Sequence, residues 1–499
     1  MRNSVTAWAS WADFRSAECQ TIDMPCGGDL PSAFFFPADY SVGMANLGFH
    51  YIYRALAEHG VAVERFFCSP VPYRSVERDT MLERFSIVFA SVSYEGDIPR
   101  FAEWLAGGGI APSRRDHRRN DAQLIGVGGA ITYINPLSLS DIADFIVLGD
   151  AVSLIPFLVE TLRTTTDRGE RLRRLAEHPS FLVPKVHIDQ QSAVPRSVHK
   201  AGDLDDEYGH ANWVTPRTVF GKTLLVELQR GCVGACRYCT LPSCFRPFRQ
   251  RNVRLIERDI REASKRVFFD RVGLVTPEAS DYGHLDDLLV LIERLDKGVS
   301  FASLRVDGLT SRMVDALTRG GRHSITIAPE SGDDDLRRTC GKPFINEEIV
   351  QTMCMARDRG ILNAKLYFMI GLPGETDDLV VSIATLCGRL REETGLRINA
   401  AVSPFVPKPG TAWASMPFEG ESALKRKIRL LTRVFSGRSG SSLQVASIKE
   451  ACVEYALSWG TVQTSRDIST AAAGKDVKKW KRRDVDRDRV REELSRLGL

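Results

Sequence analysis

The chain has 499 residues, of which 43% are hydrophobic and 26% charged, and its formal net charge is +4. This composition is typical of a globular protein, and the length exceeds what one hydrophobic core supports, so we expect two or three domains. No apolar run approaches the roughly eighteen residues of a membrane span, and the first residues contain no apolar signal segment. We therefore expect a cytoplasmic protein without a membrane partner, whereas the weak charge neither requires nor excludes nucleic acid.

Residues 1–30 form a lead-in without a clear period, and residues 31–165 then alternate strands with helices. The strands are short and continuously apolar, which favours a parallel sheet covered on both faces, that is, a doubly wound, Rossmann-like α/β domain. The predicted strands are residues 33–37, 61–67, 86–94, 122–129 and 144–150, and the predicted helices are residues 42–60, 97–109 and 152–165.

Three further regions follow. Residues 166–220 are rich in charges and turns and form a connector with minor structure. Residues 221–415 resume the alternation with about six βα units, which predicts a partial (β/α)6 barrel. Residues 416–499 form a mainly helical region with a charged tail. Ligands of such parallel sheets bind at the carboxyl ends of the strands.

The segment RGCVGACRYCTLPSC (230–244) places Cys232, Cys236 and Cys239 directly after the first strand of the predicted barrel. Clustered thiols in a cytoplasmic chain favour metal ligation over disulfides. With Cys244 as the fourth ligand, the loop would close a structural zinc site. Three thiolates on a four-iron cluster would instead leave one iron open to a substrate. Chance clustering is the remaining interpretation.

The C-x3-C-x2-C spacing, with the aromatic Tyr238 before the last cysteine, resembles the loop of the radical S-adenosylmethionine (SAM) superfamily. The resemblance implies a [4Fe–4S] cluster on Cys232, Cys236 and Cys239, whose open iron binds SAM. One electron from the cluster would cleave SAM to a 5′-deoxyadenosyl radical. The resemblance also implies a small-molecule substrate and a reducing partner such as flavodoxin or ferredoxin.

Later segments resemble strand ends of the same superfamily: SLRVDGLT (303–310), ITIAPESGDDDLRRTCGK (325–342), KLYFMIGLPGET (365–376) and AVSPFVPKPGTAW (401–413). The segment TPEAS (276–280) departs from the family, because it lacks both glycines of the usual Gly-Gly-Glu. The SAM contacts that the resemblance implies are Tyr238, Glu278, Ser280, Arg305, Glu330, Ser331, Gly371 and Pro373. The alternatives are local roles, namely a helix N-cap for Glu330, Ser331 or Asp333, pairing of Arg305 with Asp307, and a simple turn at residues 371–375.

The N-terminal region resembles the cobalamin-binding-like domain that precedes the radical domain in many members. Its candidate cobalamin contacts lie at predicted strand ends and are Ser91, Ser93, Gly128, Gly129 and Gly149. The sequence departs from one pattern, because none of its nine histidines has an Asp-x-His-x-x-Gly setting for a ligand to cobalt.

Four functions are compatible with these features. The first is a cobalamin-dependent methyltransferase that acts on an unactivated carbon of a small biosynthetic molecule. The second is a ring-forming or rearranging radical enzyme without bound cobalamin. The third is transfer-RNA modification as in the methylthiotransferases, although Cys19, Cys26 and Cys68 lack the setting of their second cluster. The fourth, an electron-transfer or structural iron–sulfur or zinc protein, does not explain the later strand ends.

We do not expect nucleic acid as a partner. The basic segment KKWKRR (478–483) of the charged tail is the feature that would bind it, and an exposed solvated face is the competing interpretation.

Overall fold

The computed structural model describes residues 10–116, 123–192, 195–436, 440–474 and 485–499, so the segment KKWKRR lies outside the described residues. The chain divides into two compact units. The first comprises residues up to 224, residues 261–268 and residues 456–499, and the second comprises residues 225–260 and 269–455. None of the described helices is long and apolar enough to cross a bilayer.

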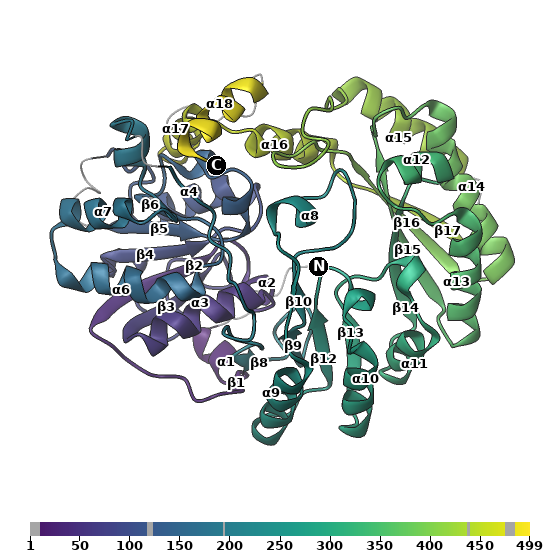
Figure 1. Cartoon of the computed structure of the whole chain (residues 1–499), viewed down its shortest axis with the longest axis horizontal. Helices are drawn as coiled ribbons and strands as arrows, with labels where there is room; N and C mark the ends of the chain where they lie inside the picture. The colour runs from purple at the N-terminus through teal and green to yellow at the C-terminus, as the bar shows by residue number, and fades with distance from the viewer. Residues whose placement is uncertain (1–9, 117–122, 193–194, 437–439, 475–484) are drawn as a thin grey trace, which may run out of the picture. The chain divides into compact units, whose positions relative to one another are not determined.

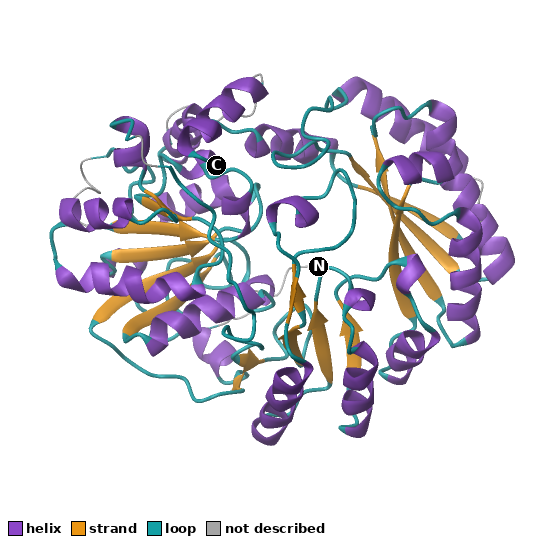
Figure 2. Cartoon of the chain, viewed as in Figure 1, coloured by secondary structure: helices purple, strands orange, loops and turns teal. Residues whose placement is uncertain are grey.

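The first unit is built on a six-stranded sheet with the order β3-β2-β4-β5-β6-β7 (Figure 2). Its first five strands in sheet order are parallel, and β7 joins the edge antiparallel. The strands are β2 (Leu30–Phe36), β3 (Val61–Phe67), β4 (Ile87–Ser91), β5 (Leu124–Gly128), β6 (Phe145–Val147) and β7 (Phe181–Leu182). The helices are α1 (Trp11–Arg15), α2 (Tyr40–Gly43), α3 (Leu47–Glu58), α4 (Asp97–Gly107), α6 (Ile155–Thr164), α7 (Arg168–Glu177), α17 (Val462–Ala472) and α18 (Arg487–Leu497).

Aromatic residues of β2 show why this sheet is covered on both faces. Phe34 stacks on Phe49 of α3 with ring centroids 4.3 Å apart, and Phe35 stacks on Trp104 of α4 at 3.6 Å. Because successive side chains of a strand point to opposite faces, α3 and α4 must cover opposite faces of the sheet. The predicted doubly wound α/β domain is confirmed.

The C-terminal segment completes the first unit through buried polar contacts. The side-chain amide of Asn135 donates to the carbonyl oxygens of Ser458 (3.1 Å) and Gly460 (2.9 Å), and the Ser138 hydroxyl donates to Leu457 O (3.0 Å). Helix α17 also packs against α4 and against the short 3₁₀ helix Leu137–Leu139. Residues 457–469 therefore belong to the core of this unit.

The second unit contains parallel βα repeats in two sheets, ordered β13-β12-β9 and β14-β15-β16-β17. The strands are β9 (Thr223–Glu227), β12 (Arg271–Val275), β13 (Gly298–Phe301), β14 (Ser324–Glu330), β15 (Asn363–Ile370), β16 (Arg397–Pro404) and β17 (Ser441–Val445). The helices are α8 (Leu241–Cys244), α9 (Val253–Arg266), α10 (Leu285–Arg294), α11 (Ser311–Arg319), α12 (Asp334–Thr339), α13 (Asn346–Asp358), α14 (Asp377–Thr394), α15 (Glu421–Phe435) and α16 (Ile448–Ser458). The partial parallel barrel predicted from the sequence is confirmed, with β17 as an additional strand.

Minor strands join the ends of these elements. Strand β1 (Cys19–Gln20) pairs with β8 (Trp213–Val214), and β10 (Gln229–Arg230) pairs with β11 (Arg249–Gln250). The second pair forms the base from which the cysteine loop projects.

Strand β15 shows which face of the second sheet the helices cover. Its residues alternate between buried side chains, such as Leu366, and half-buried or exposed ones, such as Lys365 and Tyr367. Helices α13, α14 and α15 lie along one face of this sheet (Figure 1). The buried set packs under these helices, and the polar set lies on the opposite face.

Candidate functional site

The three motif cysteines lie on the irregular loop between β10 and α8. Cys232, Cys236 and Cys239 are half-buried and none forms a disulfide. Two backbone hydrogen bonds of 3.0 Å hold the loop, one from Arg237 N to Cys340 O and one from Trp413 N to Arg237 O. The loop is therefore held from two sides.

Gly341 allows the closest of these approaches. Its φ is +93°, and a Cβ at this position would lie 2.2 Å from the carbonyl oxygen of Ala235 and 3.0 Å from Cα of Cys236. Only glycine permits both this conformation and this contact. The turn after α12 thus acts as a backbone support for the cysteine loop.

The three thiols lie close enough to affect one another. Burial, with a smaller contribution from the neighbouring Cys236 and Cys232, raises the pKa of Cys239 to about 11, although the Lys342 ammonium lowers it. Burial also raises the pKa of Cys236, again against Lys342. A metal cluster binds thiolates, so a nearby cation favours the ligating form.

This donor set fits a cluster held by three thiolates. Among the described residues, no group of three or more His, Cys, Asp or Glu is gathered as a single metal ion would require. A four-iron cluster holds its thiolates farther apart than one ion does, and three thiols on one half-buried loop suit it. The fourth cysteine, Cys244, lies on α8, where a Cβ at Gly410 would be 3.0 Å from its sulfur.

Tyr238 and Glu330 are brought together beside this loop. The Tyr238 hydroxyl donates to Glu330 Oε1 at 2.7 Å, and Lys342 Nζ donates to the same oxygen at 2.6 Å. Glu330 is buried and has φ +67°, a strained conformation for a residue other than glycine. Lys342 is the last residue of the segment 325–342 that resembles the family, but the sequence does not single it out as a contact.

The N-cap of α12 is Asp333, whose carboxylate accepts from Leu336 N at 2.8 Å. Ser331 contributes to the same turn, since its hydroxyl accepts from Asp333 N at 3.1 Å. Of the three residues that the sequence offered as the N-cap of α12, namely Glu330, Ser331 and Asp333, the structure shows Asp333 in that position. The carboxylate of Glu330 takes no part in the cap.

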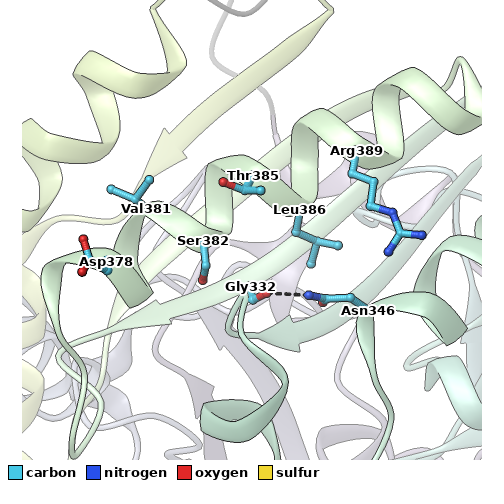
Figure 3. A pocket seen from close by; sticks show the side chains of 8 residues that line it. All are labelled: Gly332, Asn346, Asp378, Val381, Ser382, Thr385, Leu386 and Arg389. Carbon is cyan, nitrogen blue, oxygen red and sulfur yellow. Dashed lines mark hydrogen bonds between the residues drawn. The ribbon is translucent and has the colours of Figure 1, made fainter.

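Hydrogen bonds and a close backbone contact fix the loop after β14 on the side that faces α14. The buried guanidinium of Arg337 donates to Ser331 O (2.7 Å) and to Asn346 Oδ1 (2.6 Å), and Asn346 Nδ2 donates to Gly332 O at 2.7 Å (Figure 3). A Cβ on Gly332 would lie 2.2 Å from the backbone of Ser382 in α14. The groove shown in Figure 3 lies between this loop and α14, and none of the predicted SAM contacts lines it.

Glu278, Ser280 and Arg305 form a second group, at the ends of β12 and β13. The Ser280 amide and hydroxyl donate to Glu278 Oε1 at 3.2 and 2.9 Å. Burial raises the pKa of Glu278, and the hydrogen bonds from Ser280 oppose that shift. Arg305 pairs with Asp307 at 2.9 Å, as the alternative interpretation anticipated.

Gly371 and Pro373 lie in the turn that follows β15. Gly371 has φ +80°, and its amide donates to Glu375 Oε2 at 2.7 Å. Lys427 of α15 donates to the same Glu375 oxygen at 2.8 Å. Leu372 of this turn packs in a cluster that Tyr238 contacts. The sequence predicts this turn, but it does not predict the buried Lys427–Glu375 pair that holds it.

The predicted N-terminal contacts lie at the carboxyl ends of β4, β5 and β6. Ser91 pairs in register with Gly128. Gly129 has φ +110°, and a Cβ there would lie 2.4 Å from Val92 O; Gly149 has φ +95° and a Cβ would lie 2.0 Å from His199 O. Close backbone contacts within the protein therefore explain why Gly129 and Gly149 are glycines. Ser93 is half-buried at the same edge.

The fold and the three-thiol loop define a class of protein in which three thiolates can hold an iron–sulfur cluster at the carboxyl end of a partial parallel barrel. Two families match the chain: residues 226–387 match the Radical SAM superfamily, and residues 48–184 match a family described as Radical SAM proteins, N-terminal. The chain belongs to the radical SAM superfamily. Membership implies a [4Fe–4S] cluster and SAM as cofactors.

Relatives fall into two groups. An uncharacterized protein of Methanocaldococcus jannaschii, MJ0966, is 24% identical over 404 residues, which span 80% of this chain and 82% of that protein. The ribosomal protein uS12 methylthiotransferase RimO of Desulforudis audaxviator is 25% identical over 230 residues, 43% of this chain and 49% of RimO. The similarity to RimO thus covers less than half of either protein.

Two solved structures share the fold over most of the chain. The radical SAM methyltransferase TsrM of Kitasatospora setae has a TM-score of 0.51 at 14% identity, covering 77% of this chain and 75% of TsrM. The cobalamin-dependent radical SAM enzyme OxsB has a TM-score of 0.54 at 16% identity, covering 84% of this chain and 58% of OxsB.

Proposed function

We propose that this protein is a cobalamin-dependent radical SAM methyltransferase that acts on an unactivated carbon of a small molecule. The observation that carries the proposal is the combination, in one chain, of a three-thiol loop on a partial barrel with a doubly wound N-terminal sheet. TsrM, solved with cobalamin and a [4Fe–4S] cluster, and OxsB, solved with aqua-cobalamin, share this fold.

In this proposal, Cys232, Cys236 and Cys239 hold the cluster. When bound, the cluster and SAM would supply a radical that takes hydrogen from an unactivated carbon, and cobalamin would deliver a methyl group obtained from a second SAM. The edge formed by Ser91, Ser93 and Gly128 receives cobalamin.

The chain's own residues bind and orient SAM. Glu278, buried and held by Ser280, suits an ammonium group, and Arg305 beside it suits a carboxylate. Lys342 and Tyr238 fix the Glu330 carboxylate at the end of β14, so that it is oriented before SAM arrives.

Anaerobic reconstitution tests the proposal. The triple variant Cys232→Ala, Cys236→Ala, Cys239→Ala is expected to lose iron and the formation of 5′-deoxyadenosine with a chemical reductant. Cys354→Ala, a half-buried cysteine on α13, is the matched control and should retain both. Cobalamin binding is read from visible absorption, and methyl transfer from labelled SAM. Continued formation of 5′-deoxyadenosine by the triple variant would refute the cluster assignment.

A second candidate is a radical reaction without cobalamin. The observation in its favour is that the space beside Gly129 and Gly149 is filled by the protein's own backbone. Protein that forms 5′-deoxyadenosine but takes up no cobalamin would support this candidate against the first.

A further inference from the structure

A solvent-open cavity of about 550 Å³ lies at the amino ends of β14, β15, β16 and β17, the end of the sheet opposite to the candidate SAM site. Lys365, the third residue of β15, lies five residues before the carboxyl end of that strand at Ile370. At about 3.3 Å per residue, the two ends are separated by roughly 16 Å. None of the predicted SAM contacts lines this cavity.

The cavity is cationic. Among the described residues, Lys365, Arg391 and Arg397 line it and no Asp or Glu does so. In the part of the chain that the structure describes, neither Lys365 nor Arg397 forms an ion pair, and Lys365 Nζ lies over the Tyr367 ring at 4.8 Å from its centroid. Arg391 is directed by hydrogen bonds to the carbonyl oxygens of Gly395 and Leu396. Three cations around one cavity, none of them facing a carboxylate among the described lining residues, favour an anion.

Neutral hydrogen-bonding groups stand beside the cations because of the strand register. Lys365 pairs with Asn399, and Asn399 pairs with Ser442 on the next strand. Residues paired in this way point to the same face of a parallel sheet. Lysine, amide and hydroxyl groups therefore form one row across three strands on the face that the helices do not cover.

Asn399 supplies an independent sign of a ligand. Its side-chain oxygen is buried at the cavity wall and has no hydrogen-bond partner among the described residues. A buried acceptor without a donor is costly, and amide orientation is set by the partners available. The oxygen is closed off in the unliganded protein, so a ligand hydroxyl or amine next to the anionic group would satisfy it by drawing the amide round toward the cavity.

We propose that this cavity binds a small phosphorylated molecule that carries a hydroxyl group close to its phosphate. A phosphate suits three cations better than a single carboxylate does, because it carries more charge and three acceptor oxygens. The volume lies within the usual range for small-molecule sites. This site is independent of the proposed methyl transfer.

Calorimetric titration of the full-length protein at about 50 mM salt tests the proposal, with ribose 5-phosphate, inorganic phosphate and ribose as probes. Ribose 5-phosphate should bind, phosphate more weakly, and ribose not at all. The variant Lys365→Met, Arg397→Gln should weaken ribose 5-phosphate binding at least about tenfold. The control Arg429→Gln, Arg433→Gln removes the same charge from exposed positions on α15 and should bind as the wild type does.

Because binding is the readout, failure of methyl transfer would leave this result unaffected. If Lys365→Met, Arg397→Gln does not fold, Ser442→Asp replaces it, since this exposed residue would place an acid in the cavity. Absence of binding to the wild type, or equal loss in both double variants, would overturn the site. Equal affinity for phosphate and ribose 5-phosphate would overturn the hydroxyl requirement.

Discussion

Replacing Gly341 by alanine should release the cysteine loop. The added Cβ would lie 2.2 Å from Ala235 O, whereas ordinary contact begins near 3.4 Å, and the obstacle is backbone rather than a flexible side chain. The two segments would have to separate by more than about 1 Å. The positive φ of +93° adds strain of about 1–2 kcal/mol.

The matched control is Gly395→Ala. Gly395 has φ +73°, but no atom lies within 4 Å of an added Cβ, so this variant contains the strain without the collision. Iron per chain after anaerobic reconstitution and the free energy of unfolding in urea are the measurements. We expect both variants to lose stability and Gly341→Ala alone to lose iron. A Gly341→Ala protein with full iron and the stability of Gly395→Ala would refute the reasoning.

Three further predictions concern buried groups. Lys342→Met leaves the buried Glu330 carboxylate without its cation, so it should lower the free energy of unfolding in urea by about 3–5 kcal/mol. An unchanged free energy of unfolding would mean that solvent replaces the lysine. Lys427→Met removes the cation that Glu375 shares with Glu419 and that opposes the burial-raised pKa of Glu375. Because protonated Glu375 needs no cation, the loss of stability at pH 7 should shrink as pH falls toward the raised pKa of Glu375, and a loss independent of pH would contradict this pairing. Phe35→Ala, a fully buried ring, should cost about 3–5 kcal/mol, and a cost below about 1 kcal/mol would contradict its place in the core.

The strongly patterned parts of the fold could be predicted from the sequence. Continuous apolar runs such as residues 33–36 become buried strands, and glycines such as Gly60 end helices, because burial and backbone conformation are local properties. Strand β17 was not predicted, since the sequence SSLQV has little apolar character and pairs only because β16 offers an edge. Helix α17 is similarly polar, with its capping box at Thr461 as the signal that could have shown it.

The candidate site divides in the same way. The cysteine spacing and the strand-end segments are contiguous in sequence and were found there. Lys427 was not, because it lies 52 positions from its partner Glu375 and only the packing of α15 brings them together. Lys342 was missed although it lies only 12 positions from Glu330, since a lysine after a short helix is commonly exposed.

The contacts between the first unit and residues 457–469 have a consequence for synthesis of the chain. Ser138 donates to Leu457 across 319 positions, and the Ser469 hydroxyl donates to Asp141 across 328. Domains that emerge first from the ribosome usually fold first. Here the first sheet emerges early, but its buried polar groups stay without these partners until nearly the whole chain has been translated, so its final closure follows translation of the second unit.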